Sequence, residues 1–139
     1  MKTYARSRVT KATPERVWAI WSDVSTWKDW NSNVASMEIQ GPFRKGTSLV
    51  MHTRAGRTHQ MELTEVEAGR SFDLKTAVIP GTNFTFVCGV KPADGGSEIS
   101  QGIRVGGPLG ALFGPLIGDR VASTFTELLD GLAGAAEAK

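Results

Sequence analysis

The sequence predicts an α+β domain in which an antiparallel sheet is covered by one long helix near the C-terminus. Three observations support this prediction. Segment 113–132 has apolar residues at spacings of three and four, segment 34–105 consists of short runs separated by turn residues, and no repeat or linker interrupts the 139 residues. Helical spacing gives one buried stripe, while alternation gives strands with one buried face. We therefore expect a single domain over residues 1–139.

The first part of the chain is expected to form a strand followed by two short helices. Residues 3–11 are expected to form a first strand of mixed polar and apolar character. Thr13 and Pro14 mark a helix start, because a threonine hydroxyl can cap the first turn and proline suits the first helical position. A second helical turn is expected over residues 23–30, capped by Asp23 or Ser25.

Six further strands are expected, bounded by glycine and proline turns. They cover residues 34–40, 47–54, 57–67, 71–79, 83–91 and 97–105. The pair Ala55-Gly56 is the signal of a two-residue hairpin. With the first strand, this gives a seven-stranded antiparallel sheet and the element order of an α+β domain.

The last helix carries two different stripes. One is apolar and contains Phe113, Ile117, Val121, Phe125, Leu128 and Leu132; the other is small and contains Gly110, Gly114, Gly118 and Ala122. Interior glycines weaken a helix, and Pro115 lacks one hydrogen-bond donor, so we expect a kink or restart near Gly114. The favoured interpretation of the small stripe is that it lets the helix lie close to the sheet. The alternative is that its bare backbone leaves room, or a mobile gate, at the mouth of a cavity.

Composition narrows the classes of function. The formal net charge is +2 with scattered lysines and arginines, so no basic face for a nucleic acid is expected. Cys88 is the single cysteine, which excludes an internal disulfide and a multi-cysteine zinc site. The opening residues lack the apolar core of a signal peptide, and the uncharged run 105–118 has only 14 residues and contains two prolines. We expect a cytoplasmic protein without a membrane span, metal or cofactor, present as a monomer or weak homodimer.

Four segments together resemble a known superfamily. They read ATPERVWAIWSDVSTWKDWN (12–31), GPFRKGT (41–47), ELTEVEAGRSF (62–72) and GGPLGALFGPLIG (106–118). In this order they are similar to the START-like, Bet v 1-type (SRPBCC) superfamily, and within it to bacterial polyketide cyclase/dehydrase-like proteins. The resemblance implies a helix-grip fold, in which a curved seven-stranded sheet surrounds the long C-terminal helix and leaves a cavity. It also implies binding of lipids, polyketides or other apolar molecules, with only some members acting as enzymes.

Alternation within the strands indicates which side chains face such a cavity. Gln101 is notable because it is a polar residue in an otherwise apolar inward row, where its amide needs a partner from a ligand, a water or the backbone. Trp21, Trp27 and Trp30 are interpreted as clamps for the short helices rather than as ligand contacts, whereas Trp18 could take either role. The expected ligand-binding residues are Met61, Leu63, Phe72, Phe84, Phe86, Cys88, Gln101, Ile103, Phe113, Ile117, Val121 and Phe125.

The two histidines are the candidates for catalysis. A two-residue hairpin at Ala55-Gly56 would place His52 directly opposite His59, close enough to share a water, an anion or a metal. A third metal ligand is missing from the pattern, and arginines 54 and 57 on the same face favour solvent. Ordinary half-exposed histidines therefore remain the favoured interpretation.

The predicted function is binding of a small hydrophobic or amphipathic molecule, lipid- or polyketide-like, between the sheet and the C-terminal helix. One alternative is a polyketide cyclase or dehydratase that uses a cavity histidine as general base. Another is a regulatory module that binds a partner through the glycine-rich segment 106–118, which predicts a small or filled cavity. No catalytic motif distinguishes these possibilities.

Overall fold

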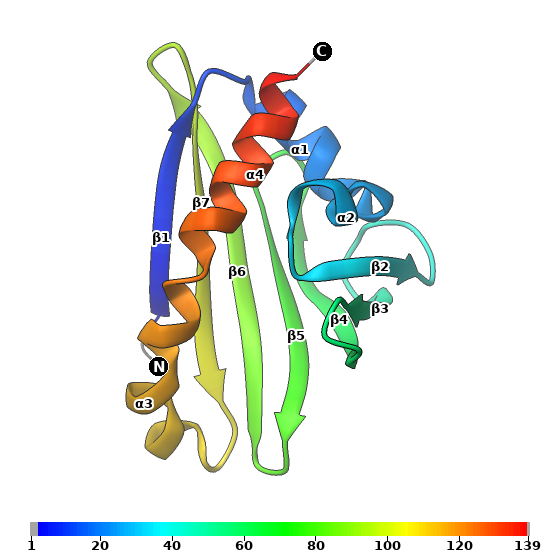
Figure 1. The fold of residues 1–139 in the computed structure, drawn as a ribbon, viewed down its shortest axis with the longest axis vertical. Helices are drawn as coiled ribbons and strands as arrows, with labels where there is room; N and C mark the ends of the chain where they lie inside the picture. Colours follow the sequence, from blue (N-terminus) through cyan, green and yellow to red (C-terminus); the bar gives the residue numbers. More distant parts are fainter. Residues whose placement is uncertain (1–2, 139) are drawn as a thin grey trace.

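The computed structural model describes residues 3–138, except for the side chains of residues 78 and 79. A single antiparallel sheet has the strand order β1-β7-β6-β5-β4-β3-β2. Two C-terminal helices lie along the face of the long strands β1, β7 and β6, and two short helices close the upper right of the view (Figure 1). The elements are β1 (Thr3–Thr10), α1 (Pro14–Ser22), η1 (Val24–Thr26), α2 (Trp27–Trp30), β2 (Val34–Ile39), β3 (Ser48–Thr53), β4 (Thr58–Glu67), β5 (Ser71–Ile79), β6 (Thr82–Ala93), β7 (Gly96–Gly106), α3 (Gly110–Ala122) and α4 (Phe125–Glu137).

The predicted fold class is confirmed, and so are the local signals that begin the short helices. The Thr13 hydroxyl accepts a hydrogen bond from the Arg16 N–H, with Pro14 in the first turn of α1. The Asp23 carboxylate accepts one from the Ser25 N–H at the start of η1. Both caps satisfy N–H groups that would otherwise lack a partner.

An aromatic cluster joins the short helices to the sheet. The Phe72 ring on β5 packs edge-on against Trp21, with ring centroids 5.2 Å apart, and also contacts Trp18, Trp27 and Phe43. The Trp27 indole N–H donates to the Trp21 carbonyl at 2.9 Å, so its polar atom is satisfied inside the core. The tryptophans therefore do clamp the short helices, as expected from the sequence.

The C-terminal segment is two helices rather than one. The helix α3 continues through Gly114 and Pro115, so the interruption expected near Gly114 is wrongly placed; the chain breaks at residues 123–124 instead. There the Ser123 hydroxyl donates to the Arg120 carbonyl at 2.6 Å, and the Thr124 hydroxyl donates to the Val121 carbonyl at 2.7 Å. Hydroxyls that bond nearby carbonyls compete with regular helical hydrogen bonds, which accounts for the position of the break.

The buried face of α3 is the small-residue stripe. Gly110, Gly114, Gly118 and Ala122 are buried, whereas the larger residues of the apolar stripe on this helix are only half-buried. A Cβ on Gly110 would lie 2.7 Å from the Val105 carbonyl oxygen, and one on Gly118 would overlap the Tyr4 ring. The close approach of helix and sheet is thus the role of these glycines, which confirms the favoured interpretation.

The hairpin between β3 and β4 differs from the prediction by one residue. Residues 54–56 form a three-residue loop: Gly56 has φ +86°, and the Thr53 N–H donates to the Arg57 carbonyl at 2.8 Å. His52 consequently lies opposite Thr58, and Met51 lies opposite His59. Because a shift of one residue reverses the face of every side chain, His52 and His59 lie on opposite faces of the sheet.

Candidate ligand-binding cavity

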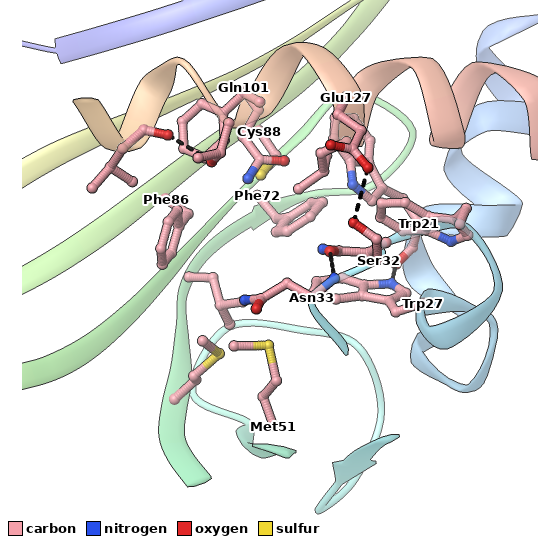
Figure 2. Close-up of a pocket in the computed structure, with 18 residues that line it drawn as sticks. Trp21, Trp27, Ser32, Asn33, Met51, Phe72, Phe86, Cys88, Gln101 and Glu127 are labelled. Atoms are coloured by element: carbon pink, nitrogen blue, oxygen red, sulfur yellow. Dashed lines mark hydrogen bonds between the residues drawn. The ribbon is translucent and has the colours of Figure 1, made fainter. Parts of the chain in front are cut away.

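A cavity of about 470 Å³ lies between the sheet, the α3–α4 segment and the loop that follows α2 (Figure 2). Its volume falls within the range of about 300–1,000 Å³ that is usual for small-molecule sites. The lining residues are Trp21, Trp27, Trp30, Asn31, Ser32, Asn33, Met51, Met61, Phe72, Leu74, Phe86, Cys88, Gln101, Val121, Thr124, Phe125, Glu127 and Leu128.

Most of the wall is aromatic or aliphatic. Phe86 on β6 and Phe125 at the start of α4 meet edge to face, with ring centroids 6.1 Å apart. Phe72 belongs to both the cavity wall and the aromatic cluster under the short helices. Flat rings held by a packed core present a rigid apolar surface, which suits burial of an apolar ligand body.

The sheet side of the cavity carries two uncharged polar groups. Cys88 and Gln101 are paired across β6 and β7, so they lie next to each other on the same face. Burial raises the pKa of the Cys88 thiol well above its usual value, and the negative charge of Asp73 adds to this shift. The thiol therefore stays protonated near neutral pH and is a poor nucleophile.

The remaining polar residues gather at the cavity mouth, which we define as Asn31, Ser32, Asn33, Thr124 and Glu127. All but the half-buried Asn31 are solvent-exposed, so the cavity opens to solvent here. The Ser32 hydroxyl donates to the Glu127 carboxylate at 3.2 Å and joins the loop after α2 to α4 across the opening (Figure 2). The Asn33 N–H donates to the Asn31 side chain at 3.0 Å, which shapes the loop.

The residues expected from the sequence divide into two groups. Met61, Phe72, Phe86, Cys88, Gln101, Val121 and Phe125 line the cavity. The others do not: Leu63 and Ile103 are fully buried in the packed core, Phe84 packs beside Ile103, and Phe113 and Ile117 lie on α3 away from the lining. Alternation identifies the inward face of a strand, but not where along the strand the cavity ends.

Sequence reasoning missed the mouth and assigned the tryptophans only a structural role. Trp21, Trp27 and Trp30 are buried clamps that also present a surface to the cavity. The polar run Asn31-Ser32-Asn33 directly after a tryptophan-rich segment was the one available signal for a solvent-facing rim. Loop residues have no periodicity, so their position follows only from the folded chain.

The paired-histidine arrangement is wrong. The His52 ring lies on the outer face, with Nε2 3.0 Å from the Glu38 carboxylate and Nδ1 3.2 Å from the Thr58 hydroxyl. His59 lies on the inner face opposite Met51, but is absent from the cavity wall. Across residues 3–138, no three His, Cys, Asp or Glu side chains lie close enough together to hold a metal ion.

A seven-stranded antiparallel sheet around C-terminal helices, with a largely apolar cavity between them, defines a helix-grip fold. The chain belongs to the family described as polyketide cyclase / dehydrase and lipid transport, whose model matches residues 1–137. A comparison with curated proteins gives no significant match. In the described residues, no helix is long and apolar enough to cross a membrane.

Solved structures show the same fold at low sequence identity. Ara h 8.0201 superposes with a TM-score of 0.74 at 14% identity, covering 97% of each chain. The di-domain ARO/CYC protein BexL from the BE-7585A biosynthetic pathway gives a TM-score of 0.73 at 15% identity, covering 99% of this chain and 50% of that one. Truncated norcoclaurine synthase from Thalictrum flavum gives 0.68 at 17% identity, covering 99% and 95%. These likenesses establish the architecture and no particular ligand.

Proposed function

We propose that this protein binds a small hydrophobic or amphipathic molecule, lipid- or polyketide-like, in the cavity between the sheet and the C-terminal helices. The observation that carries the proposal is the combination of an aromatic wall, a volume of about 470 Å³ and a solvent-exposed polar mouth. Cavities of this kind bury the ligand body and leave a polar group accessible. The family description, which covers polyketide cyclases and lipid transport, agrees with such a ligand.

Burial of apolar surface would supply most of the affinity. About 200–300 Å² of apolar ligand surface corresponds to roughly 5–8 kcal/mol at 25 cal/mol per Å². Losses of ligand and side-chain freedom reduce this figure, so affinities on the order of micromolar are expected. The polar groups would then orient the ligand rather than provide the main driving force.

Each alternative from the sequence has one observation in its favour: the family description names polyketide cyclases, and Leu109, Leu112 and Leu116 of segment 106–118 are exposed. Neither observation outweighs the cavity. The cyclase alternative depended on a histidine in the cavity, and neither His52 nor His59 lines it. The partner-binding alternative required a small or filled cavity, whereas this one has room for a ligand. The proposal is therefore a binding protein whose ligand comes from the apolar, lipid- or polyketide-like class.

The test uses N-phenyl-1-naphthylamine, an uncharged dye that fluoresces in apolar surroundings. We expect saturable binding to the wild-type protein and loss of most of that binding in Val121→Phe, because Val121 lines the cavity and the larger ring occupies it. Leu116→Phe is the matched control on the same helix, since Leu116 is 65% exposed and lies outside the cavity. Equal dye binding by both folded variants would refute the proposal.

Native mass spectrometry gives an independent readout. Protein purified under native conditions is expected to carry, or to take up from mixed lipids and aromatic polyketides, one apolar adduct per chain. The same adduct should be absent from folded Val121→Phe and present on Leu116→Phe. A protein that stays free of adducts throughout this series contradicts the proposed function.

A further inference from the structure

We infer that the cavity selects an uncharged ligand, with an oxygen or amide group that hydrogen-bonds to the sheet wall, and rejects the corresponding carboxylate. This inference rests on the proposed binding function and specifies the chemical class of the ligand. It is carried by three features: the Gln101 amide, its neighbour Cys88 and the distribution of charged groups around the cavity.

Gln101 presents an unused amide to the cavity. The residue is only 7% exposed and lines the cavity wall from β7 (Figure 2). Among residues 3–138, no protein group hydrogen-bonds to its side chain, and its amide atoms are open to the cavity, because the one sealed side-chain polar atom without a partner is Thr82 Oγ1. A primary amide has two donor hydrogens and an acceptor oxygen. A ligand that displaces solvent from this amide must replace the hydrogen bonds it removes, so a ligand group that both donates and accepts, or a carbonyl that accepts, would be favoured here.

The group beside this amide adds no charge. Cys88 is paired with Gln101 across the two strands and lines the same wall. Its buried thiol stays neutral because burial raises its pKa. The sheet wall of the cavity therefore offers weak and neutral hydrogen-bonding groups, with no formal charge.

Positive charge is missing from the lining. No lysine, arginine or histidine occurs among the described residues of the cavity wall, and its one charged side chain is Glu127 at the mouth. Arg6 and Arg8 on β1 are held by Asp119 at 3.1 Å and Asp130 at 2.6 Å. Arg54 is outside the lining, and its guanidinium donates to the Lys28 carbonyl at 3.0 Å.

An anionic ligand would thus lose water without gaining a counter-ion. A carboxylate placed against Gln101 could accept hydrogen bonds from the amide, but its charge would remain unpaired in apolar surroundings. A carboxylate turned toward the mouth would instead meet the negative charge of Glu127. An amide, ketone or alcohol of the same shape avoids both penalties and still satisfies Gln101.

Three probes with one apolar body separate these contributions: 2-ethylnaphthalene, 2-naphthamide and 2-naphthoate. Binding of each is measured by displacement of N-phenyl-1-naphthylamine near pH 7. We expect 2-naphthamide to bind at least about tenfold more tightly than 2-naphthoate, because an unpaired buried charge is more costly than a satisfied amide. 2-Ethylnaphthalene reports burial of the apolar body alone.

Gln101→Met and Glu127→Gln assign the selectivity to residues. We expect Gln101→Met to weaken 2-naphthamide about five- to tenfold and to leave 2-ethylnaphthalene unchanged, which also shows that the variant is folded. Glu127→Gln should strengthen 2-naphthoate about two- to fivefold without affecting 2-ethylnaphthalene. Gln60→Met and Glu62→Gln are the matched controls, since both residues are exposed and neither lines the cavity.

The outcomes distinguish this inference from the proposed function. If 2-naphthoate binds as tightly as 2-naphthamide, or if Gln101→Met weakens all three probes equally, selection for an uncharged ligand is refuted while a binding cavity stands. The proposed function and this inference fail together if none of the probes displaces the dye and if Val121→Phe binds the dye as well as the wild type does.

Discussion

The Ser32 hydroxyl lies 3.2 Å from the Glu127 carboxylate and bridges the opening of the cavity. The two residues are 95 positions apart in the chain, so the bridge links the loop after α2 to the first turn of α4. Both side chains are exposed, and a hydrogen bond to a charged acceptor in such a place is worth about 1 kcal/mol or less. A contact of this strength can narrow the mouth and still break readily.

Removal of the bridge should accelerate ligand exchange. In Ser32→Ala, we expect the association and dissociation rates of N-phenyl-1-naphthylamine to rise together by about two- to fivefold, because the bond restrains the opening rather than the bound dye. Stopped-flow fluorescence measures both rates. The exposed Ser48→Ala is the control, and a changed dissociation rate with an unchanged association rate would argue against a role in opening.

The small stripe of α3 should be intolerant of even one methyl group. Gly118→Ala would place a Cβ against the Tyr4 ring, so we expect a loss of about 1–3 kcal/mol in the free energy of unfolding. Gly134→Ala on α4 is the opposite case: no atom lies within 4 Å of its added Cβ, and removal of a helix glycine should stabilise by about 0.5–1 kcal/mol. Urea unfolding of both variants checks the contrast. Equal effects would show that α3 does not approach β1 as closely as described.

Glu137 at the end of α4 should make the free energy of unfolding depend on pH. The hydrogen bond from the Thr10 hydroxyl lowers the pKa of Glu137 below its ordinary value of 4.5, helped by the Lys11 N–H and nearby positive charges. A lowered pKa means that the carboxylate stabilises the fold fully above pH 4.5, and that this contribution disappears as the pH falls through the lowered value.

The corresponding test compares wild type with Glu137→Gln. The thermal midpoint of the wild type should exceed that of the variant at about pH 7, and the two should converge as the pH falls below the lowered pKa of Glu137, where both side chains are uncharged. Glu65→Gln serves as the control, because Glu65 is exposed and pairs only with Lys45 across the surface. A difference that persists at low pH would assign the effect to packing instead of charge.

The thiol of Cys88 should react slowly. Because burial raises its pKa, alkylation by iodoacetamide near neutral pH is expected to be at least about a hundredfold slower in the folded protein than in the protein unfolded with urea. Bound N-phenyl-1-naphthylamine should slow it further, since Cys88 lines the cavity. Mass spectrometry follows the reaction. Rapid alkylation that the dye leaves unaffected would place the thiol outside the binding site.

Much of the architecture follows from local signals. Thr13, Pro14 and Asp23 begin the short helices because their side chains satisfy free N–H groups, wherever those helices pack. Alternation in β5, β6 and β7 identified Phe72, Cys88 and Gln101 as inward residues, since successive side chains of a strand point to opposite faces. These features depend on the chain's own geometry, so they were readable before the fold was known.

Other features depend on contacts between distant segments. The register of β3 and β4 was set by a three-residue loop rather than a two-residue one, and that single residue separated His52 from His59. On α3, the glycines rather than the larger apolar residues face the sheet, because Val105 and Tyr4 leave room only for backbone. Neither the β3–β4 register nor the sheet-facing side of α3 can be read from the spacing of hydrophobic residues in the sequence.

The cavity itself belongs to this second group. The sequence determined a seven-stranded sheet with an apolar inner face and a helical C-terminal cover, because hydrophobic periodicity and turn residues are local properties. Tertiary structure decided where that inner face is packed and where it is left open. Leu63 and Ile103 lie in the core, the Gln101 amide faces the cavity, and Ser32 contacts Glu127, because each outcome is fixed by which distant atoms fill the adjoining space.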